Sequence, residues 1–413
     1  MPRPVERSGV PGPLLLVLAL LSALAPFATD MYLPAFTALA ADMRTTAPAV
    51  QLTLTAFLIG LAAGQLLIGP LSDRFGRRAP LLVAMTVATA AGAACALAPD
   101  VRVLIGARFV QGFAGSAGIV IARAAVADRV AGPAAARIFA LLASIGGIAP
   151  VVAPLAGGAL VPFGWRSEFW VLTAICALML LGSLLTVRES LPADRRHTGG
   201  LAVTGRTVRR LFTDRVYLGH TLAFALGFAG LMAYISASPF VLEGVLGLST
   251  TAYTVAFAVN ALGMMAAGLL GSRLVGRFHP RTLLTAGQIV VLVLSVVLLA
   301  LLALGLPAPV VLPVLFVLVG SVTLILGNAS ALAVDRAPWA SGTAAAVMGA
   351  LQFALGALVS PLVGIAGEDT GLPMGIALVT TAVLGLAARL LTRGAAEPSG
   401  ERARGAEPSP AVP

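Results

Sequence analysis

Lysine is absent from this chain of 413 residues, so each of its 27 strongly basic residues is an arginine. The phosphate-binding loop GxxxxGK[ST] requires its lysine, and a covalent adduct between a lysine amine and a cofactor requires one too. The absence excludes both kinds of site, and we expect neither a bound nucleotide nor a cofactor.

Cysteine and histidine are scarce, with two and three copies respectively. Cys95 and Cys176 fall within apolar stretches, where a disulfide framework is not indicated. His197, His220 and His279 are scattered near polar segments, and none has a second ligand at a zinc-like spacing. We therefore expect no metal site.

Charged residues make up only 11% of the chain, whereas soluble domains contain about 25%. A bilayer-spanning helix needs about 20 mostly apolar residues, because its backbone groups must be satisfied within the segment. Twelve apolar runs meet this requirement, at about 14–35, 50–70, 80–98, 103–126, 137–161, 169–187, 216–238, 250–271, 282–304, 309–333, 342–366 and 372–391. The sequence therefore predicts an all-α membrane protein with twelve transmembrane helices.

The formal net charge of +10 does not indicate nucleic-acid binding, because a basic surface for nucleic acid would cluster on a soluble domain. The arginines instead follow the predicted spans. With a cytoplasmic N-terminus, all but Arg44, Arg102, Arg108 and Arg166 fall in cytoplasmic loops, tails or adjoining helix ends. This distribution fits the positive-inside rule and predicts that both termini are cytoplasmic.

The longest internal polar gap divides the apolar runs into two sets of six. We predict two six-helix bundles related by a pseudo-twofold axis around a central cavity, an architecture common in transporters. The predicted segments are a cytoplasmic tail at 1–13, bundles at 14–188 and 216–391, a cytoplasmic linker at 189–215, and a disordered cytoplasmic tail at 392–413.

A dense polar motif, GPLSDRFGRR, lies between the second and third runs. It contains Gly69, Asp73, Arg74, Gly76, Arg77 and Arg78. The motif resembles the GxLaDrxGrr loop of the major facilitator superfamily, in which the aspartate is thought to bind near the start of the eleventh helix. The resemblance implies a gate: Asp73 would lie at the positive end of the helix that begins near 341–343, while Arg74 or Arg77 pairs with Asp128. The alternative is a basic anchor for topology, which explains the arginines but not Asp73 or the glycines.

Two charges lie inside predicted spans: Asp30 in the first and Arg108 in the fourth. Intramembrane charges normally face a partner, a cavity or an ion path. A rise of 1.5 Å per residue places the two at nearly the same depth. We hypothesise that Asp30 carries a proton and that Arg108 modulates it; the alternative is a permanent structural ion pair.

Three further motifs narrow the resemblance. DMYLPA in the first span, RFVQG in the fourth and GWR followed by Phe169 resemble the bicyclomycin-resistance (Bcr/CflA) branch of drug:proton antiporters. The fifth span resembles the GxxxGPxxGG element of antiporters in the superfamily, although alanines stand at two glycine positions. Its small residues and prolines are Gly146, Gly147, Pro150, Pro154, Gly157 and Gly158.

Polar residues within apolar spans are candidates to line the substrate cavity. The predicted substrate-binding residues are Asp30, Tyr32, Gln111, Tyr234, Asn260 and Gln352. A cavity with few polar and many apolar groups favours an amphipathic organic compound over a sugar.

These features predict a monomeric, proton-coupled exporter of a small amphipathic organic compound, a drug or antibiotic, in the bacterial plasma membrane, working by alternating access. Its expected partners are that solute, protons and the lipid bilayer. The first alternative is a symporter or uniporter that imports a metabolite on the same fold. A membrane sensor without transport activity is the second. An intramembrane enzyme is disfavoured, since the sequence indicates no paired carboxylates, Ser/His couple or metal cluster within the spans.

Overall fold

The computed structural model describes residues 11–130, 132–192, 196, 200–275, 277–364 and 370–392. Within these residues, twelve helical stretches are long and apolar enough to cross a bilayer, which confirms the predicted fold class. The first half contains α1 (Gly12–Asp30), α2 (Phe36–Asp42), α3 (Ala47–Phe75), α4 (Arg78–Ala96), α5 (Val101–Arg129), α6 (Gly132–Leu160) and α7 (Trp165–Thr186). The second half contains α9 (Arg215–Pro239), α10 (Thr250–Val275), α11 (Pro280–Ala303), α12 (Ala308–Asp335), α13 (Ser341–Val359) and α14 (Leu372–Ala387).

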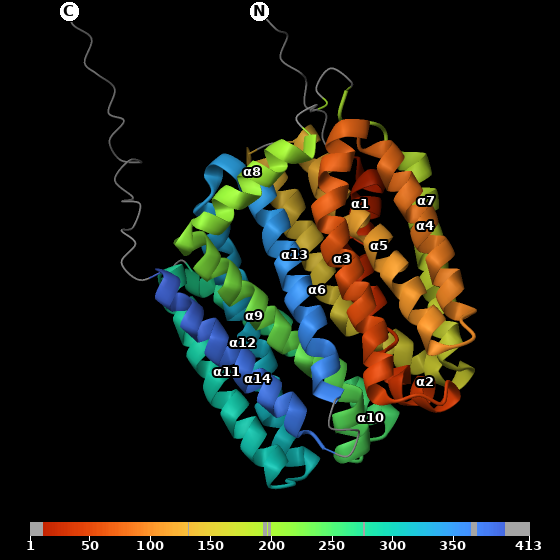
Figure 1. Ribbon diagram of the computed structural model, residues 1–413, viewed down its shortest axis with the longest axis vertical. Coiled ribbons are helices and arrows are strands. Elements are labelled where there is room, and N and C mark those ends of the chain that lie inside the picture. Colours follow the sequence, from red (N-terminus) through yellow and green to blue (C-terminus); the bar gives the residue numbers. More distant parts are fainter. Residues whose placement is uncertain are drawn as a thin grey trace, which may run out of the picture.

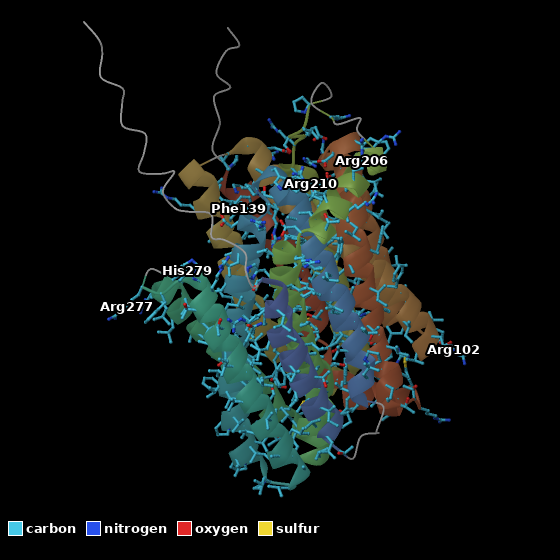
Figure 2. The ribbon with its side chains drawn as sticks, turned by 60° about the vertical axis from the view of Figure 1, so that its left-hand side comes forward. Arg102, Phe139, Arg206, Arg210, Arg277 and His279 are labelled. Carbon is cyan, nitrogen blue, oxygen red and sulfur yellow. The ribbon has the colours of Figure 1, made fainter. Side chains whose placement is uncertain are left out.

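The two halves form two bundles of long helices (Figure 1), with α3 and α6 of the first half facing α13 and α10 of the second. The short helix α8 (Gly200–Thr213) crosses one end of the molecule and contacts α3, α9 and α13. We call this end the α8 end and the other the distal end. Arg206 and Arg210 project at the α8 end, whereas Arg102 lies toward the distal end (Figure 2).

Helix α8 is a feature that the sequence analysis missed, because the polar gap was interpreted as a linker. Leu211 of α8 is buried against Tyr217, Ala333 and Val347 of the second half. The guanidinium of Arg210 lies 4.2 Å from the centre of the Trp339 ring. An apolar face packed on the bundle and a basic face turned outward explain how a helix forms in a segment of high polarity. Within the gap, Asp194, Arg195 and His197 lie outside the described residues, as do the predicted tails apart from residues 11–13 and Thr392.

The first span is broken near its middle. Helix α1 ends at Asp30, and the chain passes through a single 3-10 turn, η1 (Leu33–Ala35), into α2. Proline has no backbone N–H, so Pro34 cannot donate to the carbonyl of Asp30 and the α-helix cannot continue. The seventh span changes similarly after Pro239, where α9 continues as a π-helical turn, η4 (Phe240–Val245).

Helices α3 and α5 cross at glycines. A Cβ atom on Gly112 would overlap the carbonyl oxygen of Phe57, and one on Gly60 would overlap the backbone of Phe109. Small residues allow this close approach between membrane helices. The crossing fixes α5, which carries Arg108, against α3.

We expect Gly112→Ala to lower the free energy of unfolding by about 1–3 kcal/mol, because the added methyl group meets backbone that cannot rotate away. Thermal unfolding in detergent measures the change. Gly106→Ala on the same helix is the control, since a Cβ there meets nothing within 4 Å. Equal midpoints for the two variants would contradict the role assigned to the crossing.

Candidate functional site

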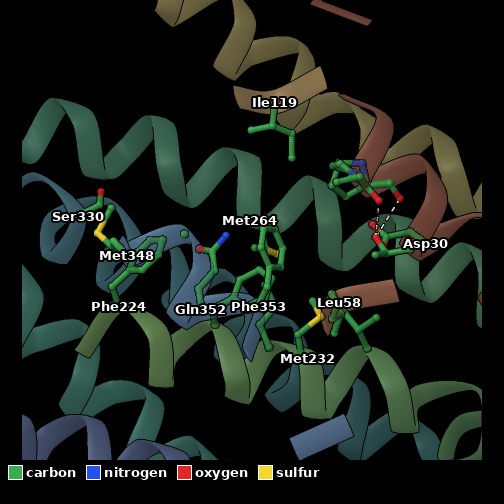
Figure 3. Close-up of a pocket in the computed structure, with 18 of the residues that line it drawn as sticks. Asp30, Leu58, Ile119, Phe224, Met232, Met264, Ser330, Met348, Gln352 and Phe353 are labelled. Atoms are coloured by element: carbon green, nitrogen blue, oxygen red, sulfur yellow. Dashed lines mark hydrogen bonds between the residues drawn. The ribbon is translucent and has the colours of Figure 1, made fainter. Parts of the chain in front are cut away.

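A cavity of about 670 Å³ lies between the bundles. Side chains from α1, α3, α5 and α6 of the first half and from α9, α10, α12 and α13 of the second line it. Its lining runs from Asp30, midway along the first span, to Ser330 and Met348 toward the α8 end (Figure 3). The space is open toward that end, where Arg123 and Val334 line it.

The distal end of the cavity is closed by contacts between the halves. Thr37 donates a hydrogen bond to Glu243 at 3.2 Å, and Gln51 Nε2 donates to the Ser236 carbonyl at 3.1 Å. The rings of Phe36 and Phe240 lie 6.0 Å apart. The described conformation therefore gives a solute access to Asp30 from the α8 end.

Asp30 lies at the inner limit of the cavity and is 3% exposed. Its Oδ1 accepts a hydrogen bond from the Thr29 hydroxyl at 2.8 Å. No salt bridge to Asp30 is found within the described part of the chain. Because α1 ends at this residue, the carboxyl sits at a helix break, where transporter sites for ions and substrates commonly lie.

Three of the predicted substrate-binding residues join Asp30 around the cavity: Tyr234, Asn260 and Gln352. Asn260 Nδ2 donates to the Tyr234 hydroxyl at 2.8 Å, and the Tyr234 ring stacks on Phe257 at 5.6 Å. The amide of Gln352 lies between the aromatic and methionine side chains of the wall (Figure 3).

Two predicted substrate-binding residues, Tyr32 and Gln111, do not line the cavity. Tyr32 is fully buried, with its hydroxyl 3.2 Å from Thr53. Gln111 accepts a hydrogen bond from Arg108 at 2.7 Å. Both side chains are occupied in packing the arginine inside the first bundle, which corrects the prediction.

Arg108 lies at the predicted depth but contacts the backbone of α1 rather than the Asp30 carboxyl. Its Nη2 donates to the Ala28 carbonyl at 2.7 Å, and its guanidinium lies over the rings of Tyr32 and Phe57 at 4.5 and 4.2 Å. Among the described residues no salt bridge joins Arg108 to Asp30. The two residues therefore do not form the permanent structural ion pair that was the alternative. The arginine instead braces the last turn of α1, two residues before Asp30.

Much of the wall consists of residues that the sequence analysis did not single out. They are chiefly aromatic and methionine side chains, namely Phe224, Phe228, Met232, Met264, Met348 and Phe353. Nothing in their local sequence separates them from lipid-facing residues, since both groups lie on apolar helices. Arg123 was also overlooked, although the rule that directed attention to Arg108 applies to it as well.

The predicted gate residues form a cluster at the α8 end of the first half. Arg77 bridges two acids, Asp73 at 2.5 Å and Asp128 at 3.0 Å. Burial lowers the pKa of Arg77, but its hydrogen bonds with Asp128 and Asp73 outweigh this and raise it. The sequence analysis named Arg74 or Arg77 as the partner of Asp128, and in the structure the partner is Arg77. The Arg74 guanidinium lies 5.3 Å from the centre of the Phe75 ring.

Asp73 makes no hydrogen bond or ion pair with the N-terminus of α13 among the described residues in this conformation, so the contact expected of a closed gate stays a prediction. It pairs with Arg77, and its side chain is 48% exposed. A Cβ on Gly342, at the start of α13, would meet nothing within 4 Å. The two elements are therefore apart while the cavity is open toward this end.

The two motif glycines differ in their surroundings. Gly76 has a φ of +89°, in the left-handed region that favours glycine, and a Cβ there would overlap the Glu189 carboxylate. This carboxylate accepts hydrogen bonds from the backbone of Arg77 at 2.8 Å and Arg78 at 3.3 Å. By contrast, Gly69 is loosely packed, since a Cβ on it would approach only Val120, at 3.9 Å.

Helix α6, the predicted antiporter helix, touches both the break in the first span and the second half. A Cβ on Gly157 would overlap the Met31 carbonyl, and one on Gly158 would meet Thr254 of α10 at 2.6 Å. Pro150 lines the cavity and Pro154 is buried. A Cβ on Gly146 or Gly147 meets nothing within 4 Å, so close packing involves only the distal part of the motif.

Comparison with known proteins agrees with the fold of two helical bundles around a central cavity. The sequence profile described as the major facilitator superfamily matches residues 18–361. The chain belongs to the major facilitator superfamily. It is a multi-pass membrane transporter and not an enzyme.

Two curated relatives cover nearly the whole chain. An uncharacterized MFS-type transporter, YdgK of Bacillus subtilis, is 37% identical over 372 residues, which are 89% of this chain and 92% of the relative. The bicyclomycin resistance protein homolog of Haemophilus influenzae is 32% identical over 363 residues, which are 87% of this chain and 91% of the relative. A solved D-xylose-proton symporter shares the fold with a TM-score of 0.72 at 18% identity, covering 90% of this chain and 96% of the symporter.

The stability of the hydrogen bonds around the Glu189 carboxyl should depend on pH. Burial raises the pKa of this carboxyl, but hydrogen bonds from the backbone N–H groups of Leu191, Arg77, Arg78 and Ser190 outweigh burial and lower it. A lowered pKa in the folded state stabilises the contact above the ordinary value of 4.5, and the contribution is lost as the pH falls through the folded value.

We therefore expect the amides of Arg77, Arg78 and Leu191 to lose protection from hydrogen exchange as the pH falls below about 4.5 in a titration from pH 6 to pH 3, after correction for intrinsic rates. Glu189→Gln, which cannot ionise, should abolish this pH dependence. Amides in the middle of α4 serve as the internal control. Constant corrected protection of the wild-type loop amides across this range would rule out the assigned role.

Proposed function

We propose that this protein is a proton-coupled exporter of small amphipathic organic compounds, in which Asp30 binds and releases the proton. The observation that carries the proposal is the position of Asp30, buried at the helix break and lining the inner limit of the cavity. A solute that fills the cavity contacts the element that holds the carboxyl. Competition between solute and proton for this site would couple their movements in opposite directions.

The cavity wall favours an amphipathic solute. Aromatic and methionine side chains supply adaptable apolar contacts, and Tyr234, Asn260 and Gln352 supply a few hydrogen-bonding groups. A sugar needs many more polar partners than this wall offers. The name of the Haemophilus influenzae relative, bicyclomycin resistance protein homolog, also supports a drug-like solute.

Alternating access would exchange the closure at the distal end for one at the α8 end. Asp73 and the free N-terminus of α13 are the elements that would meet when the α8 end closes, in the way the family resemblance implies. Arg77 would hold Asp73 and Asp128 in place through the exchange. The arginine distribution supports a cytoplasmic position for the α8 end and for both termini.

Arg108 would act on Asp30 through the backbone. Because it binds the Ala28 carbonyl, a shift of α5 moves the last turn of α1 and with it the Asp30 carboxyl. This route replaces the direct charge pairing expected from the sequence. Met31 and Gly157 connect the same turn to α6.

We expect Asp30→Asn to abolish coupling between proton and solute while leaving solute binding measurable. A pH difference of one unit corresponds to about 1.36 kcal/mol, or about a tenfold solute gradient for exchange of one proton. Proteoliposomes with such a pH difference should accumulate ethidium about tenfold with the wild type and only to equilibrium with Asp30→Asn.

Asp335→Asn is the matched control, because Asp335 is an exposed carboxylate at the end of α12 that does not line the cavity. Undiminished coupling in Asp30→Asn would remove Asp30 from the mechanism. The direction is tested in energised everted vesicles, where an antiporter makes the lumen more alkaline when solute is added. Failure to alkalinise would favour the importing symporter or uniporter, and saturable binding without flux would favour the sensor.

A further inference from the structure

Arg123 is a charged residue of the cavity wall to which the proposed transport cycle gives no role. It lies on α5 and lines the cavity together with Ile119, which is one turn earlier on the same face of the helix. Ile119 projects into the cavity (Figure 3). Arg123 is exposed to solvent, although protein surrounds its guanidinium on most sides. This combination is expected of a side chain that faces a cavity, and not of one on the outer surface.

The Arg123 guanidinium has no polar partner within the described part of the chain, and no neighbouring charge there acts on it. The other arginines of α5 differ in this respect. Arg108 donates a hydrogen bond to the Ala28 carbonyl at 2.7 Å, and Arg129 donates one to the Arg188 carbonyl at 2.7 Å. An intramembrane charge normally faces a partner, a cavity or an ion path. Arg123 faces the cavity, so its donors are available to a solute.

A topological anchor is the alternative role for an arginine near the α8 end. Anchoring arginines lie at helix ends, where their side chains reach the lipid headgroups. Arg129, the last residue of α5, occupies such a position, and Arg123 lies about 9 Å deeper along the helix at 1.5 Å per residue. Because Arg123 also lines the cavity, an anchor does not account for its position.

The cavity contains one charge of each sign. Asp30 and Arg123 are the charged residues among the described residues that line it. In the proposed cycle Asp30 is ionised while the solute is bound, so the wall then carries both an anion and a cation. Val334 and Met348 make the wall apolar near the α8 end. A guanidinium in such a wall attracts an anionic group more strongly than it would in open water, because the local dielectric constant is lower.

We propose that the preferred solutes are zwitterionic amphiphiles, which carry a cationic amine and a carboxylate that Arg123 binds. This inference rests on the proposed function and names the substrate class of the same cavity. The planar guanidinium of an arginine matches a carboxylate with two parallel hydrogen bonds. The amine balances the charge of ionised Asp30, so a zwitterion leaves the occupied cavity electrically neutral. A cation that lacks the carboxylate still binds through the apolar wall, but more weakly.

Equilibrium binding of two fluorescent dyes to the purified full-length protein tests the proposal. Rhodamine 19 has a cationic xanthene and a free carboxylate, and rhodamine 6G is its ethyl ester. We expect the wild type to bind rhodamine 19 about tenfold more tightly, because the ester cannot form the charge-assisted pair. Arg123→Gln should bind the two dyes equally, or the ester more tightly, since the carboxylate then enters an apolar wall without a partner. Fluorescence anisotropy in one detergent measures both dissociation constants, and comparison between variants cancels the partition of each dye into micelles.

Two variants serve as matched controls. Arg123→Lys keeps the charge and should retain part of the preference for the free acid. Arg102 is exposed on the same helix and does not line the cavity, so Arg102→Gln should bind both dyes as the wild type does. Retained binding of rhodamine 6G by Arg123→Gln shows that this variant folds.

The proposal is overturned if the wild type shows no preference for rhodamine 19, if Arg123→Gln keeps the preference, or if Arg102→Gln loses as much of it as Arg123→Gln does. The assay uses no proton gradient, so its outcome is separate from that of the Asp30→Asn proteoliposomes. A failure of proton coupling there leaves the dye preference to be explained by Arg123, and a failure of the dye preference leaves the coupling result in place.

Discussion

The break in the first span is the constraint on which the site depends. Pro34 leaves the Asp30 carbonyl without its helical partner in a region where water does not compensate, so neighbouring helices must hold the broken segment. Arg108 does so from α5 by binding the Ala28 carbonyl, and α6 does so at Gly157, where the lack of a side chain lets it approach Met31. The intramembrane arginine thus stabilises a backbone end, while Asp30 is left facing the cavity.

The same contacts connect the break to the boundary between the bundles. One residue beyond Gly157, α6 packs through Gly158 against Thr254 of α10. A change in the angle between the halves would therefore reach the last turn of α1 through a single helix. In the proposed cycle, this explains why an antiporter concentrates small residues at this part of α6, whereas Gly146 and Gly147 lie in open surroundings.

The fold was predictable from sequence because each span must satisfy its own backbone, so every one produces a long apolar run. The site was predictable only in part. Intramembrane charge revealed Asp30 and Arg108, but Tyr32 and Gln111 were assigned to the cavity when they pack around Arg108. Phe228 and Met232 could not be found, because an apolar side chain that lines a cavity has no local signal distinguishing it from one that faces lipid. Helix α8 was missed since its apolar face becomes visible only against the second bundle.

The polar contacts at the two ends of the molecule differ in whether they cross between the halves. At the α8 end the ion pairs of Arg77 lie within the first half, so they do not oppose separation of the bundles. At the distal end, the two hydrogen bonds from Thr37 and Gln51 cross between the halves, and such bonds contribute about 0.5–1.5 kcal/mol each. A proton that moves through a potential of 100 mV supplies about 2.3 kcal/mol. In the proposed cycle the energy available from one proton is therefore comparable to that of the two hydrogen bonds that cross between the halves at the distal end.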